Sequence, residues 1–197
     1  MKKIFISLSV VLLIIMQSCM IAANISDLNT NYPIESNYID DFTKDHIIKS
    51  QEIAFRDTNS NRVITIQIFI INDSLSAKVG LGITGEKSFY VSKDNKLSFL
   101  FEDGSVSNFI LTETKVSEYK VYQFGYYTTT HHYIYTNAYL DPNMLYYLES
   151  KTIKKVRFET SNGYVQVNNV DKLYSDKVNL FIRNFYYQAI YSPDRKK

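Results

Sequence analysis

Residues 62–71 read RVITIQIFII, and every second position of this stretch is an isoleucine: Ile64, Ile66, Ile68 and Ile70. The positions between them hold Thr65, Gln67 and Phe69. Side chains of a β-strand alternate between its two faces, so this period of two predicts a strand with one face in the protein core. We take it as the central strand of the fold.

Turn sequences recur every eight to twelve residues on both sides of this strand. The strongest are Asp103-Gly104 and Asn162-Gly163, each of which separates two apolar runs. These dipeptides accept the positive φ angles of a tight hairpin. Regular spacing of this kind predicts a mainly β (α+β) fold, an antiparallel meander that forms a sandwich or partial barrel.

Two helices are expected in the second half of the chain. Asp141-Pro142 offers an N-cap acceptor followed by proline at the first helical position, and the helix should end near Ser150. A second helix should begin at about Asp171, because Tyr174, Val178, Phe181 and Phe185 then lie on one stripe. Both helices should pack on the sheet.

The N-terminus has the layout of an export signal. Lys2 and Lys3 precede an uncharged apolar segment, residues 4–16, and Ser18 directly precedes the one cysteine of the chain, Cys19. The segment resembles the lipobox of bacterial lipoproteins, although Met16 and Gln17 depart from its usual residues. The resemblance implies cleavage before Cys19 and lipidation of that cysteine. The alternative is cleavage after Ala22-Ala23, which would release a soluble exported protein.

The expected organisation has four parts. Residues 1–18 form the signal peptide, and residues 19–40 form a lipidated N-terminus and a flexible tether without helical or strand period. Residues 41–192 form a single β-rich globular domain, and residues 193–197 form a frayed tail.

Charge and cysteine content exclude nucleic acid as a partner and disulfides within the domain. The formal net charge of the whole chain is +2, and loss of Lys2 and Lys3 lowers its 22 basic residues to 20, equal to its 20 acidic ones. A neutral domain lacks the basic field that nucleic-acid binding requires. No cysteine follows Cys19, so no disulfide can form within the domain.

Two parts of the sequence resemble the small uncharacterised lipoproteins that are common in Bacteroidota. The first is DFTK at 41–44, and the second is the FEDGS hairpin at 101–105 followed by a helix, IKKVRFETSNGYVQV at 153–167 and a final helix. The likeness covers most of the chain after Cys19 and is one of layout. It implies a membrane-anchored envelope protein and supplies no catalytic residue.

Three motifs fit nucleotide or metal sites poorly. Residues 80–85, GLGITG, match G-x-G-x-x-G, but the following SFYVS is typical of a strand, so we expect the glycines to form a turn or bulge and to bind no nucleotide. Residues 57–61 begin like a calcium loop, yet position six is Arg62. His131 and His132 are adjacent and point to opposite faces of a strand. We expect no metal and no cofactor.

The candidate binding face is a tyrosine ladder formed by Tyr133, Tyr135 and Tyr139, opposite Ile134 and Ala138. Rigid amphipathic rings on one face suit contacts with a protein or a glycan. In the alternative, the three rings pair with Tyr122, Phe124 and Tyr126 across the sheet or lie under the C-terminal helix.

The expected function is that of a non-enzymatic lipoprotein in the cell membrane or outer membrane, facing the periplasm or the cell surface. Its partners would be the membrane, through the lipid, and an unidentified envelope protein or glycan. The alternative is a periplasmic, glycosidase-like hydrolase that uses carboxylates such as Asp40 and Asp41, close to Asp45.

Overall fold

The computed structural model describes residues 28–57, 61–85 and 87–191. The first strands are β1 (Ile34–Ile39), β2 (His46–Ser50), β3 (Ile53–Asp57), β4 (Arg62–Ile71) and β5 (Ser74–Thr84). The later strands are β6 (Tyr90–Val91), β7 (Lys96–Phe101), β8 (Val106–Leu111), β9 (Lys115–Val116), β10 (Glu118–Phe124), β11 (Tyr127–Tyr139), β12 (Ile153–Thr160) and β13 (Gly163–Val167). The two helices are α2 (Pro142–Ser150) and α3 (Lys172–Tyr191).

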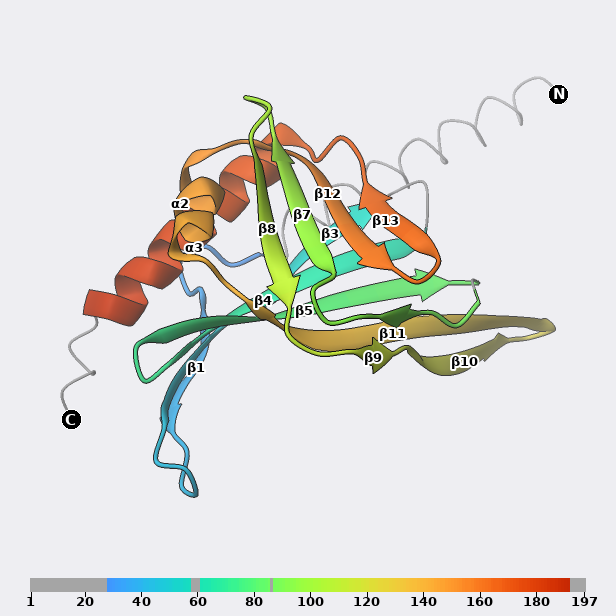
Figure 1. The fold of residues 1–197 in the computed structure, drawn as a ribbon, viewed down its shortest axis with the longest axis horizontal. Helices are drawn as coiled ribbons and strands as arrows, with labels where there is room; N and C mark the ends of the chain where they lie inside the picture. Colours follow the sequence, from blue (N-terminus) through green and yellow to red (C-terminus); the bar gives the residue numbers. More distant parts are fainter. Residues whose placement is uncertain (1–27, 58–60, 86, 192–197) are drawn as a thin grey trace, which may run out of the picture.

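One large antiparallel sheet organises the described chain. Its order is β1-β2-β4-β5-β11-β8-β7-β12-β13, with β3 beside β4 and β10 beside β11, and β6 and β9 form a separate pair. The sheet stays open. In Figure 1, β7, β8, β12 and β13 stand steeply over β4, β5 and β11, while α2 and α3 lie at one side of the fold. The predicted mainly β class, with a short helix and a C-terminal helix, is confirmed.

The isoleucine strand has the predicted two faces. Ile64, Ile66, Ile68 and Ile70 are all buried, and the residues between them are half-buried. β4 pairs with β5 on one side and with β2 and β3 on the other. Its central place therefore follows from its hydrophobic period.

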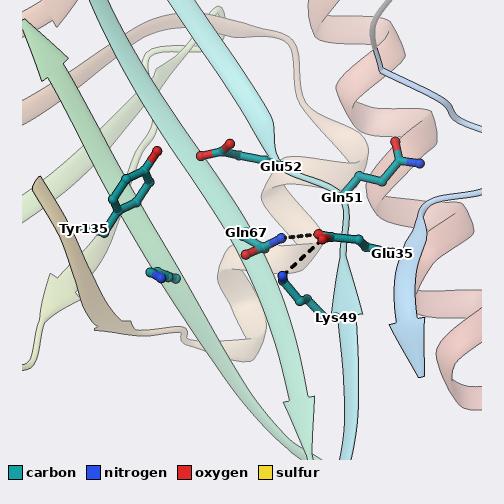
Figure 2. Close-up of a pocket in the computed structure, with 7 residues that line it drawn as sticks. Glu35, Lys49, Gln51, Glu52, Gln67 and Tyr135 are labelled. Atoms are coloured by element: carbon teal, nitrogen blue, oxygen red, sulfur yellow. Dashed lines mark hydrogen bonds and ion pairs between the residues drawn. The ribbon is translucent and has the colours of Figure 1, made fainter. Parts of the chain in front are cut away.

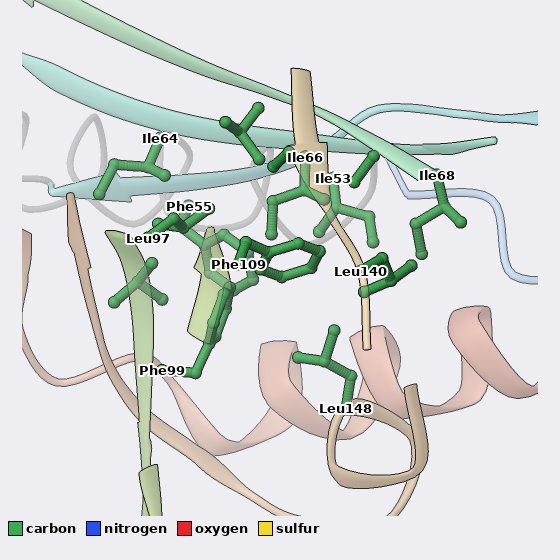
Figure 3. Close-up of a cluster of buried hydrophobic side chains, with 14 of the residues drawn as sticks. Ile53, Phe55, Ile64, Ile66, Ile68, Leu97, Phe99, Phe109, Leu140 and Leu148 are labelled. Atoms are coloured by element: carbon green, nitrogen blue, oxygen red, sulfur yellow. The ribbon is translucent and has the colours of Figure 1, made fainter. Parts of the chain in front are cut away.

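Aromatic rings fill the core between the two parts of the sheet (Figure 3). The ring of Phe99 lies 5.6 Å from that of Phe55 and 5.8 Å from that of Phe109, measured between centroids. The predicted stripe of α3 adds Val178, Phe181 and Phe185 to the core. The edge and tilted arrangements of the Phe55, Phe99 and Phe109 rings are preferred geometries of aromatic pairs.

Polar side chains close the ends of both helices against the sheet. Asp141 is the N-cap of α2, as expected, and its carboxylate accepts a hydrogen bond from the Asn143 N–H at 2.9 Å. In α3, the fully buried Ser175 accepts a hydrogen bond from the backbone N–H of Ile153 at 2.8 Å. This bond satisfies a donor that has no access to water.

Both predicted hairpins are present. Gly104 lies between β7 and β8 with φ of 81°, and Gly163 begins β13 with φ of 98°. At the first hairpin, the Asp103 carboxylate lies 2.8 Å from Nζ of Lys151 and also accepts hydrogen bonds from Ser105. These contacts, the Lys151 hydrogen bond foremost, hold the pKa of Asp103 well below its ordinary value.

The tether prediction is wrong from residue 28 onward. Leu28 is buried, and β1, at Ile34–Ile39, pairs with β2 as part of the sheet. Most residues of β1 are exposed because it is an edge strand, so it has no alternating apolar pattern in the sequence. The predicted signal peptide, Cys19 and residues 20–27 lie outside the described residues, as does the tail at 193–197.

Candidate binding face

The tyrosine ladder lies on the side of the sheet that faces away from the core. Ile134 and Ala138 are buried, whereas the exposed fractions of Tyr135 and Tyr139 are 44% and 58%, and Tyr133 is half-buried. The predicted alternation along β11 is therefore confirmed. The three rings do not lie under α3, so this part of the alternative is wrong.

The other alternative, cross-strand pairing with Tyr122, Phe124 and Tyr126, is also wrong, because the pairing of β10 with β11 ends at Tyr133. Strand β10 places Glu118, not a ring, opposite Tyr133, and it places Tyr122 opposite Thr129. The Tyr122 ring instead meets His131, at 6.0 Å between centroids.

The partners of the ladder on its other side are two glycines of β5. Tyr133 pairs with Gly82, and Tyr135 pairs with Gly80. A Cβ atom added to Gly80 would lie only 2.7 Å from Cε1 of Tyr135, so the ring occupies the space that a side chain would fill. The expectation that the glycines at 80–85 make a turn or bulge is correct only for Gly85, which has φ of 77°.

Charged side chains contact two members of the tyrosine ladder, Tyr133 and Tyr135. The Tyr133 hydroxyl donates to Oε2 of Glu118 at 2.8 Å, and this hydrogen bond raises the pKa of Tyr133. The ammonium of Lys120 lies 5.6 Å from the Tyr133 ring centroid, and that of Lys78 lies 5.2 Å from the Tyr135 centroid. These distances are within the range of cation–π attraction. The rings are thus held in defined positions although they are partly exposed.

An open hollow lies beside Tyr135 on the same face of the sheet (Figure 2). Its volume is about 450 Å³. The lining side chains come from β1, β2, β4, β5, β11 and the segment between β2 and β3: Glu35, Lys49, Gln51, Glu52, Gln67, Lys78 and Tyr135. We call this feature the outer hollow. Sequence reasoning missed it because β1 was assigned to the tether.

The outer hollow has one wall fixed by hydrogen bonds and one carboxylate that is free within the described chain. Glu35 forms the wall, because it accepts a hydrogen bond from Gln67 at 2.6 Å and an ion pair from Lys49 at 3.1 Å. The Glu52 carboxylate has no hydrogen-bonding or ion-pairing partner within the described chain, and it extends toward Tyr135 (Figure 2). Burial and, second, the charge of Glu52 raise the pKa of Tyr135, so its phenol keeps its proton at neutral pH.

Asp40, one of the carboxylates considered for a hydrolase, stabilises a turn. Asp40 and Asp41 lie at the tip of the β1–β2 hairpin, where Asp40 accepts hydrogen bonds from the N–H groups of Phe42 and Thr43 at 2.8 Å. These bonds, Thr43 first, lower the pKa of Asp40. The Asp40 carboxylate is therefore engaged with the backbone of its own turn.

The histidines follow the predicted geometry of opposite faces. The ring of His131 is hydrogen-bonded to the Thr84 hydroxyl on the outer face, whereas His132 is buried on the inner face. Within residues 28–57, 61–85 and 87–191, no group of three or more His, Cys, Asp or Glu side chains is placed to hold a metal ion. The segment at 57–61, which begins like a calcium loop, lies mostly outside the described residues.

Two further findings bear on the classification of the chain. No helix of the described part is long and apolar enough to cross a membrane. Comparison with protein-family models, with curated proteins and with solved structures gives no significant match.

Proposed function

We propose that this chain is an exported, lipid-anchored and non-enzymatic binding module of the cell envelope, and that it holds a glycan or a protein on the face that carries Tyr133, Tyr135 and Tyr139. The N-terminal layout of Lys2, Lys3 and the Ser18-Cys19 pair supports export and anchoring. The neutral charge of the chain after Cys19 supports a ligand other than nucleic acid or nucleotide.

The observation that carries the proposal is the exposure of ordered tyrosine rings beside a polar hollow. Tyr135 and Tyr139 are about half-exposed on a strand whose opposite face is core, so the rings are held by the sheet and not by a loop. Aromatic side chains held in this way lose little conformational entropy on binding. Such a face binds a macromolecule without any catalytic group.

The anchor is tested by replacing Cys19 with alanine. Each buried methylene of an acyl chain contributes about 0.8 kcal/mol, so loss of the lipid should release the domain from the membrane. Wild-type protein should take up labelled fatty acid and fractionate with the membrane, and Cys19→Ala should do neither. Retention of Cys19→Ala in the membrane pellet would contradict the anchor.

The binding face is tested with a triple variant in which Tyr133, Tyr135 and Tyr139 are replaced by alanine. Immobilised wild-type and variant domains are exposed to envelope polysaccharide and envelope protein from the producing cells. Tyr187→Ala is the matched control, because Tyr187 is 65% exposed on α3 and lies outside this face. The triple variant should lose the retained material while it still folds and unfolds cooperatively in a thermal melt.

Two results would refute the proposed function. Equal retention by wild type and the triple variant would show that the tyrosine face does not bind. Release of new reducing ends from the retained polysaccharide by the wild type would show that the domain is a hydrolase.

A further inference from the structure

We propose that the outer hollow is the binding subsite for one neutral sugar residue of an envelope glycan, with Tyr135 as its aromatic wall. This inference rests on the proposed function and selects the glycan over the protein as the ligand.

The charges of the outer hollow balance and therefore favour a ligand group without charge. Two ammonium groups, of Lys49 and Lys78, are balanced by two carboxylates, of Glu35 and Glu52. An acidic sugar would bring its carboxylate close to Glu52, and an amino sugar would bring its ammonium close to Lys78. Either charge would meet a repelling charge as well as an attracting one, and the repulsion is an electrostatic cost that offsets the attraction. A neutral sugar has no such cost.

The polar groups that remain available suit hydroxyl groups. The Glu52 carboxylate accepts hydrogen bonds but cannot donate them, and the Lys78 ammonium donates but cannot accept. The Tyr135 phenol, protonated at neutral pH, donates as well. A sugar hydroxyl both donates and accepts, so one ring with several hydroxyls can satisfy donors and acceptors around a single site.

The Tyr135 ring supplies the apolar surface that a sugar ring requires. It packs over Gly80, whose missing side chain allows the ring to approach the sheet. The exposed fraction of Tyr135 is still 44%, so part of its surface is available to a ligand. Polar side chains around one aromatic ring give a wall for the apolar face of a sugar and partners for its hydroxyls.

Size and rigidity agree with a small-molecule subsite. The volume of about 450 Å³ falls within the range of about 300–1,000 Å³ that is typical of ligand pockets. Gln67, besides its bond to Glu35, donates to the backbone carbonyl of Ser50 at 2.9 Å. Gln51 donates to the carbonyl of Tyr32 at 2.9 Å. These hydrogen bonds fix the wall in place before any ligand binds.

The test is a titration of the whole exported domain with defined oligosaccharides. The neutral panel contains oligomers of glucose, mannose, galactose, xylose and N-acetylglucosamine, and the charged panel contains oligogalacturonate and oligoglucosamine. Saturation-transfer NMR detects the binders, and calorimetry measures their affinity. At least one neutral oligomer should bind, and neither charged oligomer should bind more tightly.

Three variants assign the binding to the outer hollow. Tyr135→Ala and Glu52→Gln should each weaken binding by about tenfold, as expected for a central contact, and Tyr187→Ala should bind as the wild type does. Tyr135→Phe keeps the ring and removes only the hydroxyl, so its affinity should lie between those of wild type and Tyr135→Ala. If the alanine variant is unstable, the lower affinity of Tyr135→Phe relative to wild type still tests the site.

Several outcomes would overturn the inference. These are the absence of neutral-sugar binding, a preference for a charged oligomer, and neutral-sugar binding that Tyr135→Ala and Glu52→Gln leave unchanged. If no sugar binds but the triple tyrosine variant still loses an envelope protein, this inference fails and the proposed function stands. If neither ligand depends on the tyrosines, both fail.

Discussion

Replacement of Gly80 by alanine should disturb the tyrosine face, whereas the same replacement at Gly82 should not. The added Cβ at Gly80 would overlap Oγ1 of Thr65 and would lie 2.7 Å from Cε1 of Tyr135, which is closer than real Cβ atoms approach such neighbours. At Gly82, no heavy atom lies within 4 Å of the added Cβ. Both glycines are on the outer face of β5, so the two variants differ only in this contact.

The expected change in unfolding free energy follows from two opposing effects. Alanine in place of glycine in a strand stabilises a protein by about 0.4–1 kcal/mol, because the unfolded chain loses freedom. Overpacking costs about 1–3 kcal/mol. The first term is common to both variants, so Gly82→Ala should be slightly stabilised. The unfolding free energy of Gly80→Ala should lie about 1–3 kcal/mol below that of Gly82→Ala.

Denaturant unfolding and thermal melting measure this difference. For a domain of this size, about 1 kcal/mol corresponds to about 2–4 °C in melting temperature. A second replacement, Tyr135→Ala, should restore part of the loss in Gly80→Ala because it removes one of the two clashes. The reasoning is refuted if Gly80→Ala is as stable as Gly82→Ala, since the ring would then not lie over Gly80.

Three other perturbations test the fold. Gly104→Val and Gly163→Val should each lower the unfolding free energy by about 1 kcal/mol or more, because valine tolerates positive φ poorly; unchanged melting of both would contradict the turn assignments. Ser175→Ala should cost about 1–3 kcal/mol in denaturant unfolding, because a buried backbone N–H loses its acceptor; a neutral effect would show that this N–H finds another. Asp103→Asn should lower the melting temperature at neutral pH. Because the pKa of Asp103 is lowered in the folded state, its carboxylate stabilises the fold fully above the ordinary pKa of 3.8, and this effect is lost as the pH falls further. The melting temperatures of wild type and Asp103→Asn should therefore converge below pH 3.8. A difference that stays constant with pH would exclude this ion pair.

The sequence predicted those elements that depend on residues close to one another in the chain. The isoleucines of β4 reveal its buried face because burial and the strand period act on the same residues. Gly104 and Gly163 reveal hairpins because few other residues adopt their φ angles. Asp141 reveals the start of α2 because its side chain completes the backbone hydrogen bonding of the first turn.

The outer hollow could not be predicted because its residues meet only through long-range pairing. Its wall joins β1 to β4, since Gln67 donates to Glu35, and its aromatic side comes from β11. Edge strand β1 has few apolar contacts, so its sequence carries no periodic signal. The face of the tyrosines was predictable from alternation, but the partner of each ring depends on the register between β5 and β11.

That register accounts for the different exposure of Tyr135 and Tyr139. Tyr135 lies opposite Gly80, and its ring descends into the space that the glycine leaves. Tyr139 lies opposite Ser76, which has a side chain, and its exposed fraction is 58% against 44% for Tyr135. Gly80 therefore lets the ring of Tyr135 lie close to the sheet, whereas no atom lies within 4 Å of the space above Gly82, opposite Tyr133. Gly80, the first glycine of the pattern that resembles a nucleotide-binding motif in the sequence, thus acts as the floor beneath one aromatic ring.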